Sequence, residues 1–215
     1  MKPIFHKPDR IFLILIVFAA YLFGAEIPYS KQIRIIDFNK EQLPKEIIVK
    51  GTISECVKFA DAKGTHILVV TEYVNGEYMT PSYVSEIFAG DFLETDSKYH
   101  LLWKIWDSSN SVDATVGYEK GSLKIFDLDS NGIADSRFFY SIVKEGADPE
   151  TLKYMMHLNT IKLAIRGEIP VEDDPKQYQK NIDKAFEQIP LNIKKIASDD
   201  WDNFINTKFD ILKRK

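Results

Sequence analysis

Apolar and polar positions alternate along much of the chain between residues 47 and 166, which is the pattern of half-buried β-strands. Short runs rich in Val and Ile interrupt the alternation and indicate strands buried on both faces. Turn-forming residues such as Gly, Asn and Asp separate these runs. The strands expected from this pattern cover residues 47–59, 65–73, 98–107, 123–126, 137–143, 152–157 and 161–166.

Some stretches of this region are less regular. Asn75-Gly76 predicts a two-residue hairpin turn, because both central residues of such a turn need positive φ. Residues 77–96 are polar and contain Gly, and their pattern assigns no element. A helix over 149–158 is an alternative to the strand at 152–157, because Asp148-Pro149 is a suitable helix start. Residues 26–44 are expected to form a leading arm.

The pattern changes after Pro170, where apolar residues recur at helical spacing. Asp174-Pro175 predicts the start of a helix that continues to Ile189 and ends before Pro190. A second helical stretch is expected over residues 193–205. We expect both to cover one face of the sheet, the alternative being a groove for a partner. The predicted fold class is therefore α+β, with a mostly antiparallel β body and C-terminal helices. The expected division is a signal peptide at 1–25 and a single domain at 26–215 whose helical part is 171–215.

The first 25 residues have the organisation of a secretory signal peptide. Lys2, His6, Lys7 and Arg10 form a basic start, and an apolar run of about 15 residues follows and ends at Ala25. That run is short for a bilayer span of about 20 residues. Cleavage near Ala25 is expected, with an uncleaved membrane anchor as the alternative. The predicted location is periplasmic or secreted, with no stable membrane span after removal of the signal.

Charge argues against one class of partner. The whole chain holds 28 basic and 32 acidic residues and has a net charge of −4. A protein that binds nucleic acid needs a concentrated basic face to replace counterions on the phosphates. We therefore expect no nucleic-acid partner, and Arg166 is expected to be structural or to face another kind of ligand.

Cys56 is the only cysteine, so no disulfide within the chain is available. It lies in an alternating apolar stretch and has no basic neighbour in sequence, which indicates a buried small apolar residue and not a reactive thiolate.

His66, His100 and His157 lack the spacing of zinc ligands. No motif of a hydrolase or of a phosphate-binding loop occurs, and the catalytic residues, if there are any, stay unknown. Tyr99, Trp103 and Trp106 are candidates for a platform that stacks a sugar, but alternation places Trp103 and Trp106 on opposite faces.

An acidic segment at 127–135 carries the one pattern with specific chemistry. Side-chain oxygens occur at its first, third, fifth and ninth positions and Gly132 at its sixth, as in loops that wrap Ca²⁺ in six to eight oxygens. The expected flanks are strands, and Phe138 occupies the twelfth position, where an EF-hand has a bidentate Glu. The loop is therefore similar to strand–loop–strand calcium loops, and the alternative is a solvated Asn-Gly hairpin. The predicted ligands of a structural calcium ion are Asp127, Asp129, Asn131, Ile133 through its main-chain carbonyl, and Asp135.

Four segments, taken in order, resemble a family of exported bacterial proteins catalogued as surface polysaccharide biosynthesis proteins. They begin with Gly51-Thr52-Ile53 through Thr71 and with Leu101-Leu102-Trp103-Lys104-Ile105-Trp106-Asp107. The acidic loop with Phe139-Tyr140 is the third, and Asp148-Pro149 to Glu168 is the fourth. The chain departs from the family at His66, where Asn is usual, and at Asp135, where Glu is usual.

The resemblance implies a link to surface polysaccharide and no known reaction. We expect an exported, non-enzymatic protein that supports surface-polysaccharide assembly or display, with surface glycan or envelope proteins as partners. A hydrolase or transferase acting on glycan is one alternative, because such enzymes need two carboxylates facing one cleft. A secreted adhesin-like binding module is another.

Overall fold

The structure is a computed structural model that describes residues 33–109, 111–144, 149–159, 161–169 and 179–213. Its first sheet has the strand order β1-β2-β3-β4-β5, and every neighbouring pair is antiparallel. The strands of this sheet are β1 (Arg34–Ile36), β2 (Thr52–Asp61), β3 (Gly64–Asn75), β4 (Val84–Thr95) and β5 (Lys98–Ser108). A short 3-10 helix, η1 (Lys40–Gln42), lies between β1 and β2.

The second sheet is also antiparallel, with the order β11-β10-β9-β8-β6, and β7 pairs with β8 beside this path. It consists of β6 (Ala114–Tyr118), β7 (Lys124–Phe126), β8 (Asp135–Lys144), β9 (Glu150–Leu158), β10 (Ile161–Ile169) and β11 (Gln179–Ile182). The 3-10 helix η3 (Lys184–Gln188) and the helix α2 (Leu191–Lys213) follow. The predicted class, α+β with a mostly antiparallel β body, is confirmed.

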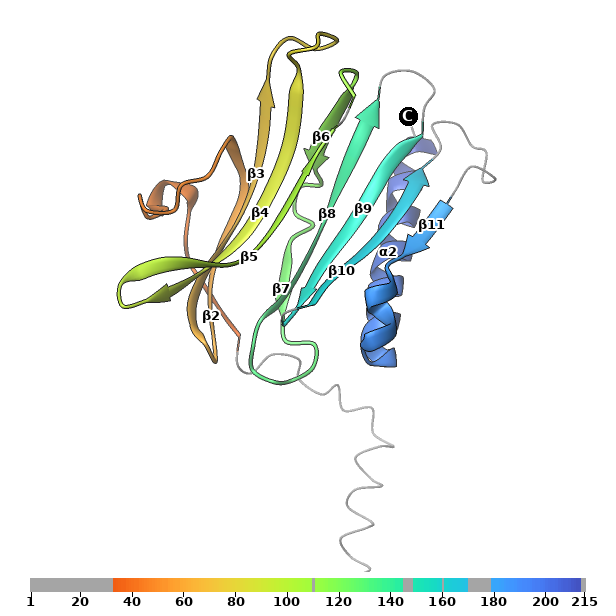
Figure 1. Cartoon of the computed structure of the whole chain (residues 1–215). Coiled ribbons are helices and arrows are strands. Elements are labelled where there is room, and N and C mark those ends of the chain that lie inside the picture. Colours follow the sequence, from red (N-terminus) through yellow and green to blue (C-terminus); the bar gives the residue numbers. More distant parts are fainter. Residues whose placement is uncertain (1–32, 110, 145–148, 160, 170–178, 214–215) are drawn as a thin grey trace, which may run out of the picture.

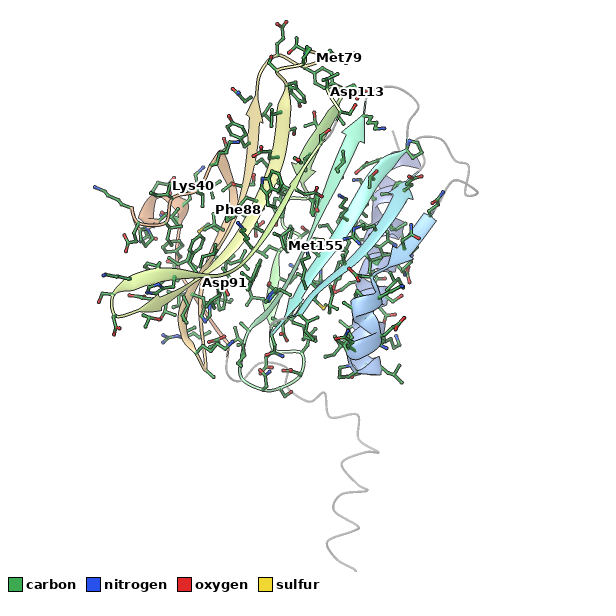
Figure 2. All side chains as sticks on the ribbon, viewed as in Figure 1. Lys40, Met79, Phe88, Asp91, Asp113 and Met155 are labelled. Atoms are coloured by element: carbon green, nitrogen blue, oxygen red, sulfur yellow. The ribbon has the colours of Figure 1, made fainter. Side chains whose placement is uncertain are left out.

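The two sheets pack face to face, and inward-facing residues of most of their strands fill the space between them (Figure 1, Figure 2). Leu68, Val70 and Ile105 of the first sheet meet Phe138 and Met155 of the second in this central core. All five are at most 3% exposed. The central core therefore holds the two sheets together and fixes the ends of their strands next to one another.

The outer face of the second sheet packs against α2. Trp201, which is fully buried, packs there with Ile193 and Ala197 of the same helix. Gly167 of β10 gives the indole room, because a Cβ atom at that position would lie 2.6 Å from the Trp201 ring and 2.3 Å from the carbonyl oxygen of Gln179. The close approach of strand and helix at this point requires glycine.

The outer face of the first sheet is covered differently. Ile47, Leu43 and Val49, from the segment between β1 and β2, pack on Ile67 and Val69 of β3. The leading arm expected over residues 26–44 thus contributes part of this cover in its described portion. Residues 1–32, which include the predicted signal peptide, lie outside the described residues. In the described part of the chain, no helix is long and apolar enough to cross a membrane.

Most expected strands are present, and the hairpin of β9 and β10 replaces the alternative helix over 149–158. Two expectations are wrong. The turn at Asn75-Gly76 is not a two-residue hairpin, because Asn75 pairs with Val84 and residues 76–83 form the loop. The helix expected to end at Ile189 is not found in residues 179–189, where β11 pairs with β10 and η3 follows. Residues 170–178 of that expected helix lie outside the described residues. The second expected helix is present as α2.

Candidate metal centre and the adjoining cavity

The acidic loop joins β7 to β8 at one end of the sandwich. Ligand atoms of Asp127, Asp129 and Asp135 lie within 4.8 Å of one another. Ser130 and Gly132 both have positive φ, and these two residues let the loop fold tightly between the carboxylates. Three of the five residues predicted to be ligands are thus brought together by the loop, and the cluster can hold a metal ion.

Main-chain amides hold the carboxylates in place. Asp127 accepts hydrogen bonds from the amides of Asn131, at 3.0 Å, and Gly132, at 2.9 Å. Asp135 accepts from the amide of Leu128 at 2.9 Å. The remaining oxygen lone pairs of each carboxylate are the ones a cation would use.

The other two predicted ligands are placed as follows. The Asn131 side-chain amide donates to Asp129 at 2.9 Å, and its Oδ1 accepts from the amide of Ile133 at 2.7 Å. Ile133 is also among the residues that line a neighbouring cavity, and the contacts described for its main chain involve the amide and not the carbonyl predicted to be a ligand. Asn131 is therefore part of the cluster through its hydrogen bonds.

Two residues of this site were missed in the sequence. Asn159, in the turn between β9 and β10, donates from its side chain to Asp129 at 2.8 Å and from its main chain to Asp135 at 3.1 Å. Asp61, at the end of β2, accepts from the amide of Ala134 at 2.8 Å. From the sequence, Asn159 with Thr160 indicates only a turn between the strands at 152–157 and 161–166, since only the fold brings that turn to the loop.

Burial makes it energetically unfavourable for the carboxyl groups of this loop to be ionised. Asp135 is fully buried and Asp127 is 5% exposed. Burial, together with the charges of Asp129 and Asp127, raises the pKa of Asp135 to about 7, although two main-chain amides oppose this shift. A bound cation would offset both the burial and the repulsion, so the donor set of three carboxylates with amide oxygens nearby fits a hard cation such as Ca²⁺.

A cavity of about 200 Å³ lies beside the loop, between the two sheets. Trp103 of β5 and His157 of β9 both line it and stack directly on each other, with ring centroids 4.4 Å apart. Burial, and to a smaller extent the charge of Lys63, lowers the pKa of His157 to about 4, so this ring is neutral at pH 7. Trp103 thus faces the interior, while Trp106 is 59% exposed on the other face of β5. The platform of Tyr99, Trp103 and Trp106 is not formed.

His66 connects this cavity to the acidic loop. Its Nδ1 lies 3.1 Å from Asp91, and its Nε2 lies 3.1 Å from Asp61, which in turn holds the amide of Ala134. Burial opposes protonation of the ring, but the hydrogen bonds and charges of Asp91 and Asp61 outweigh it and raise the pKa of His66. The cavity therefore contains two carboxylates, and both are engaged by one buried imidazole.

Cys56 is half-buried and packs beside the outer core of the first sheet. Burial raises the pKa of its thiol to about 11, which agrees with the expected apolar role and not with a thiolate nucleophile.

The fold and the site define a two-sheet antiparallel sandwich with one acidic, metal-competent loop at its end. Comparisons with protein-family models, with curated proteins and with solved structures found no match to this chain. The resemblance to surface polysaccharide biosynthesis proteins therefore stays a prediction made on the residues quoted for it.

Proposed function

We propose that this chain is an exported, non-enzymatic protein that supports the assembly or display of surface polysaccharide. In this proposal the acidic loop takes up one calcium ion, which has a structural role. The observation that supports a structural role is the set of hydrogen bonds between the loop and two neighbouring turns. Asn159 links it to the turn between β9 and β10, and Asp61 links it to the end of β2 in the other sheet.

A cation in this position would stabilise an end of the sandwich where turns of both sheets meet. Asp127, Asp129 and Asp135 would hold it, and the side-chain amides of Asn131 and Asn159, which donate to Asp129, would help to fix that carboxylate. A divalent cation at this loop supplies fixed positive charge and no reaction chemistry of its own. The amides of Leu128 and Gly132 keep the carboxylates oriented toward it.

The engagement of both cavity carboxylates supports a role without catalysis. Asp61 and Asp91 flank His66, and each has a side chain at most 8% exposed. A glycan-cleaving pair needs one carboxyl as an acid and the other as a base or nucleophile, both facing the substrate. Carboxylates held on the two nitrogens of one imidazole do not have that arrangement.

A deletion strain of the source bacterium tests the function. Surface polysaccharide extracted from the deletion strain should be reduced in amount or shortened, and wild-type protein supplied in trans should restore it. An Asp129→Ala copy should restore it only in part, because the sandwich end is less stable without the cation. An unchanged polysaccharide in the deletion strain would contradict the proposed function.

A second assay separates the enzyme alternative. Purified protein incubated with isolated surface polysaccharide should release no new reducing ends, with or without calcium. Release that disappears in Asp91→Asn would instead establish a glycan-cleaving enzyme.

A further inference from the structure

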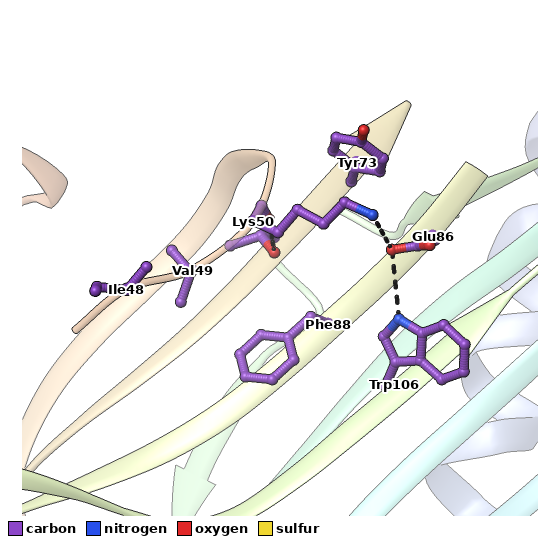
Figure 3. Close-up of a pocket in the computed structure, with 8 residues that line it drawn as sticks. Ile48, Val49, Lys50, Tyr73, Glu86, Phe88 and Trp106 are labelled. Atoms are coloured by element: carbon purple, nitrogen blue, oxygen red, sulfur yellow. Dashed lines mark hydrogen bonds and ion pairs between the residues drawn. The ribbon is translucent and has the colours of Figure 1, made fainter. Parts of the chain in front are cut away.

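A second concave site lies on the outer face of the first sheet, beyond the end of its cover. The cavity measures about 210 Å³. It lies where the end of the segment between β1 and β2 runs beside β3, β4 and β5, and Figure 3 shows the residues of this segment and of the three strands that line it. The side chains that line it come from that segment and from the three strands, and they include Lys50, Tyr73, Glu86, Phe88 and Trp106.

The strand register aligns these side chains on one face. Phe88 of β4 pairs directly with Trp106 of β5, and Glu86 of β4 pairs with Tyr73 of β3. Residues paired across antiparallel strands point to the same face of the sheet. Three aromatic rings therefore share one surface, and Trp106 keeps 59% of its area exposed to solvent. Ile48, which is 88% exposed, adds an apolar edge.

A carboxylate and an ammonium group stand among the rings. The Lys50 Nζ atom lies 3.6 Å from the centre of the Tyr73 ring and 2.9 Å from Glu86 Oε2. Trp106 Nε1 donates to the same oxygen of Glu86 at 3.5 Å (Figure 3). Glu86 thus orients both the lysine and the indole, and its carboxylate still has lone pairs for further donors.

The backbone fixes this arrangement before any ligand arrives. Gly51 has a φ of +92°, and a Cβ atom there would lie 2.3 Å from the carbonyl oxygen of Glu72. The chain can therefore run close to β3, and Thr71 Oγ1 donates to the carbonyl of Lys50 at 2.8 Å. Gly90 likewise leaves room for the Phe88 ring, since its missing Cβ would lie 2.7 Å from that ring. A surface held in its binding geometry loses less entropy when a ligand binds.

The chemistry of the ligand follows from this set of groups. A pyranose ring has faces of C–H bonds, which pack on the faces of aromatic rings, and hydroxyl groups at its edge that both donate and accept. Lys50 and Glu86 offer one charge of each sign to those hydroxyls and leave the site with no net charge. Because the two charges cancel, the site gives an acidic sugar no net electrostatic attraction, and the cost of desolvating its carboxylate is not offset. The cavity is smaller than the roughly 300–1,000 Å³ of common small-molecule pockets, which fits one ring of a chain that continues over the sheet.

We propose that this outer-face cavity, lined by Trp106, Phe88, Tyr73, Glu86 and Lys50, binds one sugar unit of a neutral saccharide. The inference deepens the proposed function and rests on it for its biological setting, because it names the surface that would contact glycan. It does not use the acidic loop, which lies at an end of the sandwich and serves stability.

The test is a titration of purified full-length protein with neutral hexasaccharides, namely maltohexaose, cellohexaose and mannohexaose, and with hexagalacturonate as the acidic probe. Binding is measured by calorimetry and by the change in tryptophan fluorescence. At least one neutral probe should bind at millimolar or lower concentration, and hexagalacturonate should bind more weakly. Trp106→Ala should weaken binding about tenfold or more. Trp106→Phe should have an intermediate effect, because it keeps a flat ring and loses the donor to Glu86.

Ile182→Ala is the matched control, since Ile182 is 53% exposed on β11 of the other sheet. It should bind as the wild type does, and thermal melts should show that all variants are folded. Absence of binding by every neutral probe, stronger binding of hexagalacturonate, or unchanged binding by Trp106→Ala would each overturn the inference. Failure of the proposed function can be recognised separately. If the deletion strain has normal polysaccharide but the purified protein binds a neutral probe through Trp106, the saccharide site is supported and its role in surface polysaccharide is not.

Discussion

The two outer faces of the sandwich differ in how they are covered. A helix of 23 residues, α2, closes the face of the second sheet, and its Trp201 is fully buried there. The first sheet is covered by an irregular segment that stops at Lys50, and Trp106 beside it stays 59% exposed. The same residue type is thus a core residue on one face and a surface residue on the other. The comparison indicates that the helix-covered face serves stability and the incompletely covered face is available for a ligand.

Trp201→Ala should have the largest effect on stability. The substitution leaves a cavity between α2 and β10, and buried Trp-to-Ala changes cost about 3–5 kcal/mol. Urea unfolding at equilibrium would measure the loss. Leu191→Ala in the same helix is the control, because Leu191 is 80% exposed and its change should stay within about 0.5 kcal/mol. Equal effects of the two would mean that α2 is not part of the core.

Asp91→Ala should come next, with a loss of about 3 kcal/mol, because it removes one of the two carboxylates that pair with the buried His66 ring and leaves its Nδ1 without that partner. The matched control is Glu77→Ala, which removes an exposed carboxylate from the loop between β3 and β4. Urea unfolding at pH 6 would compare the two variants. A small effect of Asp91→Ala would show that Asp61 alone satisfies His66.

The charge on His66 also predicts a pH dependence. Its pKa in the folded protein lies above the ordinary value of 6.5. Its contribution is therefore fully present below pH 6.5 and is lost as the pH rises through the folded pKa. The difference in unfolding free energy between wild type and His66→Asn should shrink over that range, and melts from pH 5.5 upward would follow it. A difference that is constant with pH would mean that the ring is neutral throughout.

Trp106→Ala should have the smallest effect on stability, within about 0.5 kcal/mol, since the ring is largely exposed. The same variant should lose saccharide binding, so that the substitution affects ligand binding while leaving the free energy of unfolding nearly unchanged. A loss of stability close to that of Trp201→Ala would contradict the difference between the faces.

The sequence predicted the strands best where local pattern and tertiary environment agree. The alternation from Lys98 to Asp107 became β5, and the run from Thr65 to Tyr73 became β3. β4 was missed because its inward face includes the polar residues Ser85 and Asp91, whose hydrogen-bond partners Val116 and His66 lie far away in sequence.

The helix expected before Ile189 was wrong for a related reason. Apolar residues recur there at helical spacing, yet Ile182 pairs with Ile165 at the edge of the second sheet. Edge pairing and the packing of Phe186 outweighed the local preference for a helix.

The sequence predicted only those residues of the candidate metal site that lie within the loop itself. Asp127, Asp129 and Asp135 are close in sequence, so their spacing alone indicated a cation loop. Asn159 and Asp61 reach the loop from other hairpins, and no pattern near residues 127–135 points to them. The outer-face cavity combines four separate segments, and of its residues only Trp106 was weighed from the sequence as a surface for stacking a sugar.

The central claim about the loop is that it binds Ca²⁺ and that the ion stabilises the sandwich end. Thermal melts of the purified protein in calcium, in magnesium and in chelator test it most directly, with Asp129→Ala and Ser130→Ala as the matched pair. An ion that binds only the folded state adds RT ln(1 + [L]/Kd), which is of order 1 kcal/mol at physiological calcium for a Kd of roughly 10⁻⁴–10⁻³ M.

That gain is expected to raise the melting temperature by a few degrees in calcium. The rise should be smaller in magnesium, absent in Asp129→Ala and unchanged in Ser130→Ala. Identical melts of the wild-type protein in all three solutions would contradict the claim and leave the acidic loop a solvated hairpin.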